Sequence, residues 1–284
     1  MSDFDPLAPA RTGGVDRLAA NLWRVIAPNP SYLTGPGTNT YVLGDQARLV
    51  IDPGPDDESH LESVLAVAGG RIDQILCTHS HTDHSPGAAR LKALTGAVVR
   101  GLPAPQDDFQ DGTYAPDRGF EDGERITVAG ATLRALHTPG HASNHVCFLL
   151  EPDGLLFTGD HLMSGSTVVI LPPDGSMRLY LDSLRQLRAM PIEALAPGHG
   201  ALMPQAHAEI DRVIAHRLKR EAKLVAALGR RERCTLDEVL AEVYDDTPVA
   251  LHALARFSLL AHALKLAEEG RAGRAGETWA WLGG

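Results

Sequence analysis

The sequence predicts an α/β domain over residues 1–204 that is followed by a smaller helical domain over residues 205–284. Three observations support this organisation. Short aliphatic or β-branched segments bounded by Gly, Pro or Asp alternate with helical spacings over the first two hundred residues. Strand signals then stop after Pro204, and a long amphipathic spacing begins at Ile210. With 284 residues, of which 44% are hydrophobic and 22% charged, the chain can form one large domain and a small one.

The predicted strands of the first domain are Asn39–Leu43, Arg48–Ile51, Gln74–Cys77, Ala97–Val99, Thr132–Leu136, His145–Leu150 and Leu155–Thr158. Helical spacing of apolar residues marks three helices between them, around residues 61–68, 86–94 and 181–190. The second of these begins at a proline, which the first turn of a helix accepts. Residues 101–124 are rich in Pro, Gly and Asp and are too long for a routine connection. They form either a lid over a site or a mobile surface loop.

The C-terminal domain begins with an amphipathic helix around residues 210–218. Thr235 can cap a second helix over residues 236–243, and a third helix over 254–264 ends before Gly270. A Gly-rich, hairpin-like end reaches Trp279. Two helices followed by a hairpin predict a winged-helix-like domain.

Charge is unevenly distributed along the chain, whose net charge is −10. From Asp211 onward 12 basic residues face 11 acidic ones, so the remaining 14 basic and 25 acidic residues lie before Asp211. The acidic first part disfavours indiscriminate binding to phosphate backbones. The basic runs Arg217–Arg220 and Arg230–Arg233 form either a nucleic-acid contact or a solvated helix face.

The composition also bears on the compartment. The longest apolar stretches, Val146–Leu150 and Val168–Leu171, are far shorter than the roughly 20 residues that cross a bilayer, so no membrane partner is expected. The acidic start Met1–Asp5 does not resemble a secretory or mitochondrial leader. Three scattered cysteines cannot form a disulfide framework and fit a reducing compartment. A cytoplasmic location is therefore predicted.

The segment Thr78–His84, of sequence THSHTDH, carries the strongest chemical signal. It follows an apolar strand and precedes Ser85-Pro86-Gly87, where a helix can start. Imidazole nitrogens bind zinc at about 2.0–2.1 Å, and four ligand-type side chains within six residues converge on a metal only from a sharp strand-to-helix turn. The segment therefore predicts a metal site.

Three further candidates, His141, Asp160 and His199, each lie where a strand runs into a Gly-containing loop. With the turn they make seven candidate ligands, namely His79, His81, Asp83, His84, His141, Asp160 and His199. One tetrahedral zinc takes four ligands at most, so seven suit two metals if one carboxylate bridges them and a shared water completes the site. Zinc is the expected metal; iron and manganese are the alternatives, because His/Asp sets without thiolate accept several first-row ions.

This motif and the separations that follow it resemble the metallo-β-lactamase fold superfamily. The resemblance implies a four-layer αββα sandwich, with Asp160 bridging two metals held by His79, His81 and His141 and by Asp83, His84 and His199. It also implies that Asp52, in Ile51-Asp52-Pro53-Gly54, supports the histidine turn through hydrogen bonds. No cysteine stands where zinc β-lactamases place a sulfur ligand, so antibiotic hydrolysis is not expected as the main activity.

A narrower resemblance is carried by Gly37–Tyr41, by Thr138-Pro139-Gly140-His141 through His145, by Gly159-Asp160 and by the helical tail with Thr247-Pro248. Together these resemble the group named after β-lactamase-like protein two, whose animal members are endoribonucleases with a winged-helix-like C-terminus. The resemblance implies a metal-dependent hydrolase of the endoribonuclease-like type.

The expected chemistry is hydrolysis by a metal-bridging hydroxide that attacks an acyl carbon or a phosphorus. Asp83 is the candidate catalytic residue, because it could orient the nucleophile or shuttle its proton. His145 and His161 are either the acid for the leaving group or hydrogen-bond partners of the ligands.

Three functions remain open at this point. The first is cleavage of single-stranded RNA, with the tail as an anchoring surface. The second is a thioesterase or lactonase of glyoxalase II type that acts on a small molecule, with the tail walling a pocket. The third is a metal-domain ligand sensor with a DNA-binding tail. A homodimer through apolar helical surface is compatible with each.

Overall fold

The computed structural model describes residues 10–44, 48–128 and 130–283. The segment Met1–Asp5, on which the expected lack of a leader rests, lies outside these residues. The described residues form two compact units. Unit 1 holds residues up to 138, 144–167 and 190–207, and unit 2 holds residues 139–143, 168–189 and 208–283. Each unit is described by itself, and the domain boundary between residues 204 and 205 stays a prediction.

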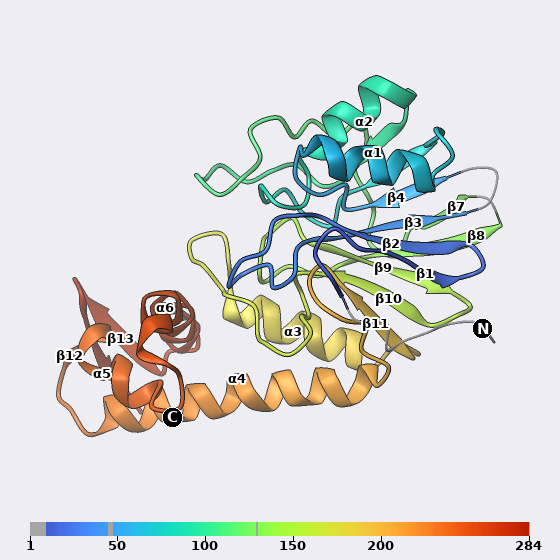
Figure 1. Ribbon diagram of the computed structural model, residues 1–284. Coiled ribbons are helices and arrows are strands. Elements are labelled where there is room, and N and C mark those ends of the chain that lie inside the picture. The colour runs from blue at the N-terminus through green and yellow to red at the C-terminus, as the bar shows by residue number, and fades with distance from the viewer. Residues whose placement is uncertain (1–9, 45–47, 129, 284) are drawn as a thin grey trace. The chain divides into compact units, whose positions relative to one another are not determined.

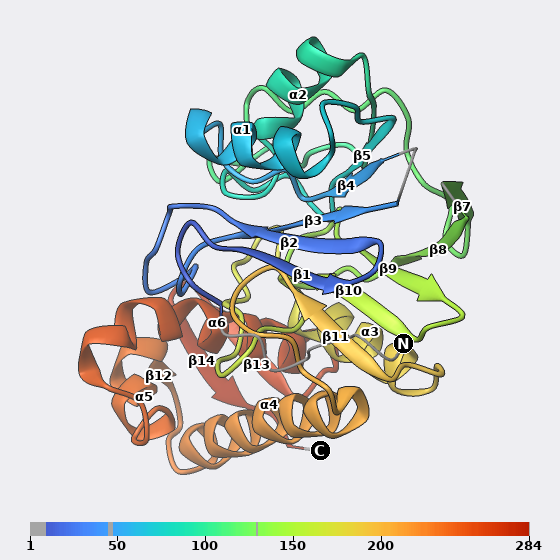
Figure 2. The ribbon, with the colours of Figure 1, turned by 45° about the vertical axis from the view of Figure 1, so that its right-hand side comes forward.

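Unit 1 contains two β-sheets (Figures 1 and 2). In its described residues, the first sheet has the order β1 (Val15–Ala19), β2 (Leu22–Ile26), β3 (Asn39–Leu43), β4 (Leu49–Ile51), β5 (Gln74–Leu76) and β6 (Val98–Arg100). The second has the order β11 (Ala194–Pro197), β10 (Leu155–Gly159), β9 (Val146–Glu151), β8 (Ala131–His137) and β7 (Arg125–Val128). Most neighbours are antiparallel, but β4 and β5 are parallel, as are β5 and β6 and β10 and β11.

Helices α1 (Glu58–Val67) and α2 (Gly87–Thr95) cover the outer face of the first sheet (Figure 1). The Asp57 side chain caps α1 by accepting a hydrogen bond from the backbone of His60, and α2 ends at Gly96 with a φ of 74°, which favours glycine. One apolar cluster lies between these helices and the first sheet, and another lies between the two sheets. Unit 1 therefore has one helical layer and two sheet layers.

The seven predicted strands are all present, with ends shifted by at most one residue. Strands β1, β2, β7 and β11 were not predicted. Strand β11, of sequence ALAP, lacks β-branched residues and ends in proline, so its sequence carries little strand signal. It pairs in parallel with β10 and is buried throughout, which shows that tertiary pairing sets its conformation.

Unit 2 contains α3 (Met177–Arg188), most of α4 (Ala206–Gly229), α5 (Leu236–Val243), the short helix η1 (Val249–Leu251), α6 (His252–Glu268) and the strands β12 (Cys234–Thr235), β13 (Ala272–Ala275) and β14 (Thr278–Trp281). The predicted cap is confirmed, because the Thr235 side chain and Glu238 form a reciprocal capping box at the start of α5. The predicted hairpin is also present, and Trp279 is 1% exposed within the apolar core of this unit. Helix α3, at the position of the helix predicted around residues 181–190, is grouped with unit 2.

Among the described residues, the stretch Val249–Glu268 is long and apolar enough to span a membrane. Polar and charged residues such as His252, Arg256 and Lys265 interrupt it, so it does not form a continuous apolar run in the sequence. Leu259, Ala263 and Leu266 of this stretch are buried in the core of unit 2. A core helix of a soluble protein passes the same length and composition test, so the stretch is weak evidence for a membrane span.

Candidate metal centre

The histidine motif lies on the turn between β5 and α2, as the sequence predicts. Within the turn, the backbone N–H groups of His84 and Ser85 both bond to the carbonyl of His81, at 3.0 and 3.3 Å. This tight reversal brings side chains from successive positions to one side. The ring centroid of His79 lies 4.5 Å from that of His81 and 4.2 Å from that of His84.

The other residues of the centre reach it from the ends of neighbouring strands. Asp52 follows β4, which is parallel to β5, and Asp160 and His199 follow the parallel pair β10 and β11. Parallel strands place their carboxyl ends at the same edge of a sheet, so each pair of strands delivers its side chains to the same place. The direction of these strands therefore explains why candidate residues that are far apart in the sequence lie close together.

Four donor atoms converge within unit 1. The His84 and His199 Nε2 atoms are 3.3 Å apart, and they lie 3.3 and 3.2 Å from Asp160 Oδ1. Asp83 Oδ2 lies 3.6 Å from His84 Nε2 and 3.3 Å from His199 Nε2. His79, His84 and Asp160 also form a group whose ligand atoms lie within 4.8 Å of one another.

These separations fit a metal. A tetrahedral zinc with ligands at about 2.0–2.1 Å requires its ligand atoms to lie roughly 3.3–3.4 Å apart. The spacing of the four donor atoms is close to that edge length. The donor set of imidazoles and carboxylates is one that zinc, iron and manganese all accept.

Hydrogen bonds set the tautomers of the imidazoles. His84 Nδ1 donates to Asp52 Oδ2 at 2.9 Å, and His199 Nδ1 donates to the carbonyl of Gly37 at 3.4 Å. Thr78 Oγ1 donates its hydrogen to Asp52 Oδ2, so it accepts from His79 Nδ1, which lies 2.9 Å away. In all three rings the proton is on Nδ1 and the lone pair on Nε2, which is the form that a metal-binding histidine requires.

The pKa values of the clustered groups also reflect their close contact. Burial acts to lower the pKa of His199, but the carboxylates of Asp160 and Asp83 more than offset it and raise that pKa to about 9. Burial would raise the pKa of Asp160, yet His199 and His84 hold it well below its usual range. The ionised carboxylates therefore favour positive charge at the Nε2 atoms of these rings, which is a proton in the absence of metal and which a bound cation would supply in its place.

Asp52 occupies the supporting position that the resemblance implied. Its carboxylate is 2% exposed and also accepts from the backbone N–H of Thr78 at 2.7 Å. Its φ of 49° is the one positive value among the described non-glycine residues, a conformation that aspartate tolerates better than most side chains. Asp52 therefore orients His84 directly and His79 through Thr78.

His145 and His161, the two other supporting candidates, are both fully buried in unit 1. His145 Nδ1 lies 3.0 Å from Thr138 Oγ1, and its ring centroid lies 5.1 Å from that of His79 and 5.7 Å from that of His161. The structure therefore places the ring of His145 beside His79 and the ring of His161 beside His145.

His141 belongs to the short segment 139–143, which is grouped with unit 2. Its Nδ1 donates to the carbonyl of Val169 at 2.9 Å, so this imidazole also has its lone pair on Nε2. Its role as a ligand beside His79 and His81 stays a prediction.

Two residues that hold the His199 loop received no chemical role in the sequence analysis. Asn39 Nδ2 donates to the carbonyls of Pro197 and Gly200, at 2.9 Å each, and the Tyr41 hydroxyl donates to Pro197 at 2.8 Å. Both residues lie in the predicted strand Asn39–Leu43 and in the segment Gly37–Tyr41, which carries part of the narrower resemblance. A pair of buried polar groups on a predicted strand was the available signal, since such groups require hydrogen-bond partners.

The segment 101–124 is fastened to the histidine turn. Asp111 donates its backbone N–H to the carbonyl of Ser80 at 2.7 Å, and its carboxylate accepts from Ser85 Oγ at 2.9 Å. Ser80 Oγ also donates to Gln110 Oε1 at 2.5 Å. This segment is therefore part of the wall of the centre, closer to the lid interpretation than to a separate surface loop.

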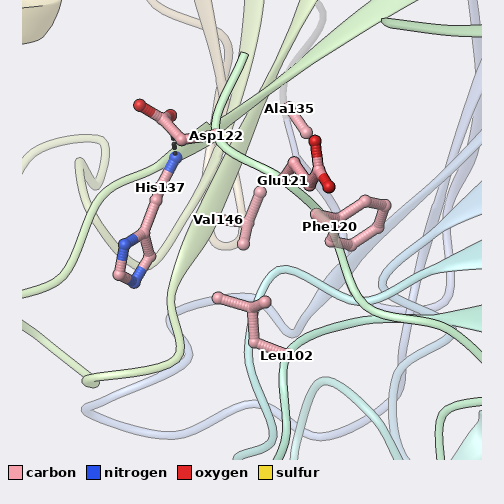
Figure 3. Close-up of a pocket in the computed structure, with 7 residues that line it drawn as sticks. All are labelled: Leu102, Phe120, Glu121, Asp122, Ala135, His137 and Val146. Atoms are coloured by element: carbon pink, nitrogen blue, oxygen red, sulfur yellow. Dashed lines mark hydrogen bonds between the residues drawn. The ribbon is translucent and has the colours of Figure 1, made fainter. Parts of the chain in front are cut away.

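A cavity of about 180 Å³ lies between this segment and strands β8 and β9 (Figure 3). Its lining is Leu102, Phe120, Glu121, Asp122, Ala135, His137 and Val146. Figure 3 shows the Asp122 carboxylate bonded to the backbone of His137, at 2.9 Å. Asn144 Nδ2 bonds both to Ser80 Oγ, at 2.7 Å, and to the carbonyl of Leu102, at 3.4 Å, so the cavity wall is connected to the histidine turn.

Two known protein families match this sequence. The family model described as the metallo-beta-lactamase superfamily matches residues 33–199, which is more than half of the chain and includes every predicted ligand. The chain belongs to the metallo-beta-lactamase superfamily. A second model, the beta-lactamase associated winged helix domain, matches residues 235–279 of this superfamily member. The predicted fold class, an α/β sandwich followed by a winged-helix domain, is therefore confirmed.

Several known proteins are similar to this superfamily member over most of its length. It is 30% identical to a beta-lactamase-like protein 2 homolog of Caenorhabditis elegans, over 95% of this chain and 92% of that protein. It is 34% identical to an atrochrysone carboxyl ACP thioesterase of Paecilomyces divaricatus, over 76% of this chain and 67% of that protein. A metallo-beta-lactamase family protein of Thermus thermophilus shares the fold, with a TM-score of 0.78 and 24% identity over 93% of this chain and all of that one.

In unit 2 of this superfamily member the basic runs are only partly exposed: Lys219, Arg230 and Arg233 are exposed, whereas two arginines of the first run are buried. Arg217 and Arg220 are only 3% and 5% exposed. Arg220 donates to the carbonyl of Val243, pairs with Asp246 at 2.7 Å and lies over the ring of Tyr244. Arg231 pairs with Glu242 at 2.9 Å. The alternation of charge in the sequence could not reveal this, because several of the partners are backbone carbonyls.

Proposed function

We propose that this chain is a hydrolase that uses two divalent metal ions, with zinc as the metal that fits best. The single observation that carries the proposal is the set of four donor atoms at tetrahedral spacing, with hydrogen bonds that keep the histidine lone pairs on Nε2. The proposed ligands are His79, His81 and His141 for one ion and Asp83, His84 and His199 for the other, with Asp160 shared.

When bound, such ions supply Lewis acidity and lower the pKa of water to about 7. The residues of the chain do the rest. Asp83 is the more exposed of the two clustered carboxylates, with 28% of its side chain accessible against 12% for Asp160. We assign Asp83 as the catalytic residue that orients the attacking water and accepts its proton. Asp52, Asn39 and Gly37 keep the imidazoles fixed while this occurs.

For the substrate we propose a thioester of a small organic acid. Support comes from the relative that is named as an acyl carrier protein thioesterase. The cavity of about 180 Å³ beside the turn offers space equal to roughly six water molecules, enough for a short acyl chain. The pairing of Arg217, Arg220 and Arg231 within unit 2 removes charge that an RNA-anchoring tail would present.

Cleavage of single-stranded RNA is the second candidate. It is favoured by the relative that matches the chain over nearly its whole length, including its tail, and that is named a beta-lactamase-like protein 2 homolog. A sensor with a DNA-binding tail is the third candidate, which requires that the metal domain performs no turnover.

One experiment decides among these functions. Protein purified without added metal is analysed for metal content and then assayed with acyl-pantetheine thioesters, a lactone and a labelled single-stranded RNA. We expect two ions per chain, turnover of thioesters, and loss of that turnover in His79→Ala and Asp83→Asn. Turnover of RNA alone would select the second candidate. Full metal loading with no turnover, together with binding to duplex DNA, would select the sensor.

A further inference from the structure

The orientation of His141 is set inside unit 2. Its segment is held there by Ser183 Oγ, which donates to the carbonyl of Pro139 at 2.9 Å, and by the backbone N–H of Ser176, which donates to Gly140 at 2.8 Å. The ring itself donates from Nδ1 to the carbonyl of Val169. That one carbonyl therefore fixes which nitrogen of His141 carries the lone pair.

The Val169 carbonyl lies in a stretch with no helix or strand, so regular hydrogen bonding does not hold it in place. Its two neighbours are held instead by long-range contacts. Arg217, from α4, donates through Nη2 to the carbonyl of Val168. Ser258, from α6, accepts through Oγ from the backbone N–H of Ile170 at 3.2 Å. The peptide that faces His141 is therefore clamped on both sides.

Both clamping residues are buried, with Arg217 3% and Ser258 5% exposed. Burial of a guanidinium is costly unless it makes strong hydrogen bonds. The Arg217 guanidinium lies 5.3 Å from the ring centroid of Tyr180 and donates a charge-assisted hydrogen bond to the Val168 carbonyl. Arg220, one turn further along α4, is buried equally but bonds to Val243 and Asp246 of the winged-helix region. Only the first of these two arginines is connected to His141.

We propose that Arg217 and Ser258 are positioning residues for His141: they hold the peptide whose carbonyl fixes the tautomer and direction of that imidazole. The inference rests on the proposed function, in which His141 binds one of the two ions. It gives the C-terminal helices a part in metal binding that does not depend on the substrate. Residues that orient metal-binding histidines typically contribute about 10–100-fold to metal affinity.

The test compares two variants of the full chain, Arg217→Met and the matched control Arg220→Met. Zn²⁺ affinity is measured by competition with a chromophoric chelator. We expect Arg217→Met to weaken one of the two bound equivalents by about 10–100-fold and Arg220→Met to leave both unchanged. Ser258→Ala should weaken the same equivalent by a smaller factor, and Arg217→Lys, which keeps a donor, should recover part of the loss. Equal effects of Arg217→Met and Arg220→Met would show a general loss of folding and overturn the inference.

A double-mutant cycle with His141→Ala separates positioning from any other role. In the His141→Ala background, Arg217→Met should cause no further change in affinity. A further loss there would mean that Arg217 acts elsewhere. If the wild-type protein binds no metal, the proposed function fails, and the positioning role is then decided by ¹⁵N NMR of the His141 ring. The Nδ1–H form in the wild type and a mixture of forms in Arg217→Met supports the role, whereas the same form in both contradicts it.

Discussion

The Asp52 carboxylate accepts the Nδ1 proton of His84 at 2.9 Å while it holds Thr78, whose hydroxyl in turn accepts from His79. One buried carboxylate therefore sets the tautomers of two imidazoles that lie five residues apart on the histidine turn. Because the backbone of Asp52 has a φ of 49°, its side chain is aimed at the turn from a conformation that few residues adopt.

Asp52→Asn should weaken metal binding. Asparagine keeps the volume and tolerates the backbone conformation, but its amide nitrogen cannot accept a hydrogen bond, so either His84 or Thr78 loses its partner. We expect a loss of affinity of about 10–100-fold at the ion that His84 binds. Chelator competition measures it.

Asp57→Asn is the matched control for this change. Asp57 caps α1 and does not contact the turn, and asparagine caps helices about as well as aspartate. Metal affinity should stay unchanged in this variant. Unaltered affinity in Asp52→Asn as well would show that the tautomer of His84 needs no help from Asp52.

Gly198→Ala should disturb the centre without unfolding the domain. A Cβ atom at this position would lie 2.7 Å from His84 Cε1 and 2.8 Å from Asp160 Oδ1, closer than real contacts allow. The two groups must move apart, so we expect metal affinity to fall by about tenfold or more while the far-ultraviolet circular dichroism is retained. In Gly112→Ala, where nothing lies within 4 Å of the added carbon, both should be preserved. Retained affinity in Gly198→Ala would indicate that the donor atoms are not used together.

Stability should fall between about pH 6.5 and pH 4 because of His60. Burial lowers the pKa of His60 to about 4, so the unfolded state, with a pKa near 6.5, binds more protons in this window. The stability associated with neutral His60 is complete above pH 6.5 and decreases as the pH falls, by about 2 kcal/mol at pH 5. In His60→Gln the free energy of unfolding should depend less steeply on pH, even if its value at neutral pH is lower. Urea unfolding of both proteins in chelator, which excludes effects of metal release, gives the comparison; parallel pH profiles would refute the assignment.

The local parts of this centre were predictable, because their information lies in short stretches of sequence. The spacing of His79, His81 and His84 within one turn requires no knowledge of the rest of the chain, and the turn is where it was expected. Asp160 and His199 were found for a related reason, since each follows a buried strand and precedes or follows a glycine. Strand direction then brings them together.

What the sequence could not provide is pairing between distant polar groups. Asn39 bonds to Pro197 and Gly200, which are 158 and 161 positions away, and their acceptors are carbonyls, which every residue has. The same reason hid the burial of Arg217, whose acceptor is the Val168 carbonyl. The charge pattern therefore predicted an exposed Arg217 where the fold buries it, because such a pattern shows side chains and not the backbone carbonyls to which they bond.

Asn39→Ala should release the His199 loop. The substitution removes two hydrogen bonds, while the carbonyl of Pro197 keeps the Tyr41 donor and that of Gly200 keeps Arg24. At a net contribution of about 0.5–1.5 kcal/mol per bond, we expect a loss of roughly 1–3 kcal/mol in the free energy of unfolding. Because His199 lies between these two carbonyls, the ion that it binds should also be held more weakly. Tyr41→Phe removes a single bond to Pro197 and leaves both Asn39 donors in place, so its effect on metal affinity should be smaller. Chemical denaturation and chelator competition on the two variants test this order. A larger loss of metal affinity in Tyr41→Phe would contradict it. That result would show that the position of Pro197, and not the two hydrogen bonds of Asn39 on either side of His199, determines how His199 binds the metal.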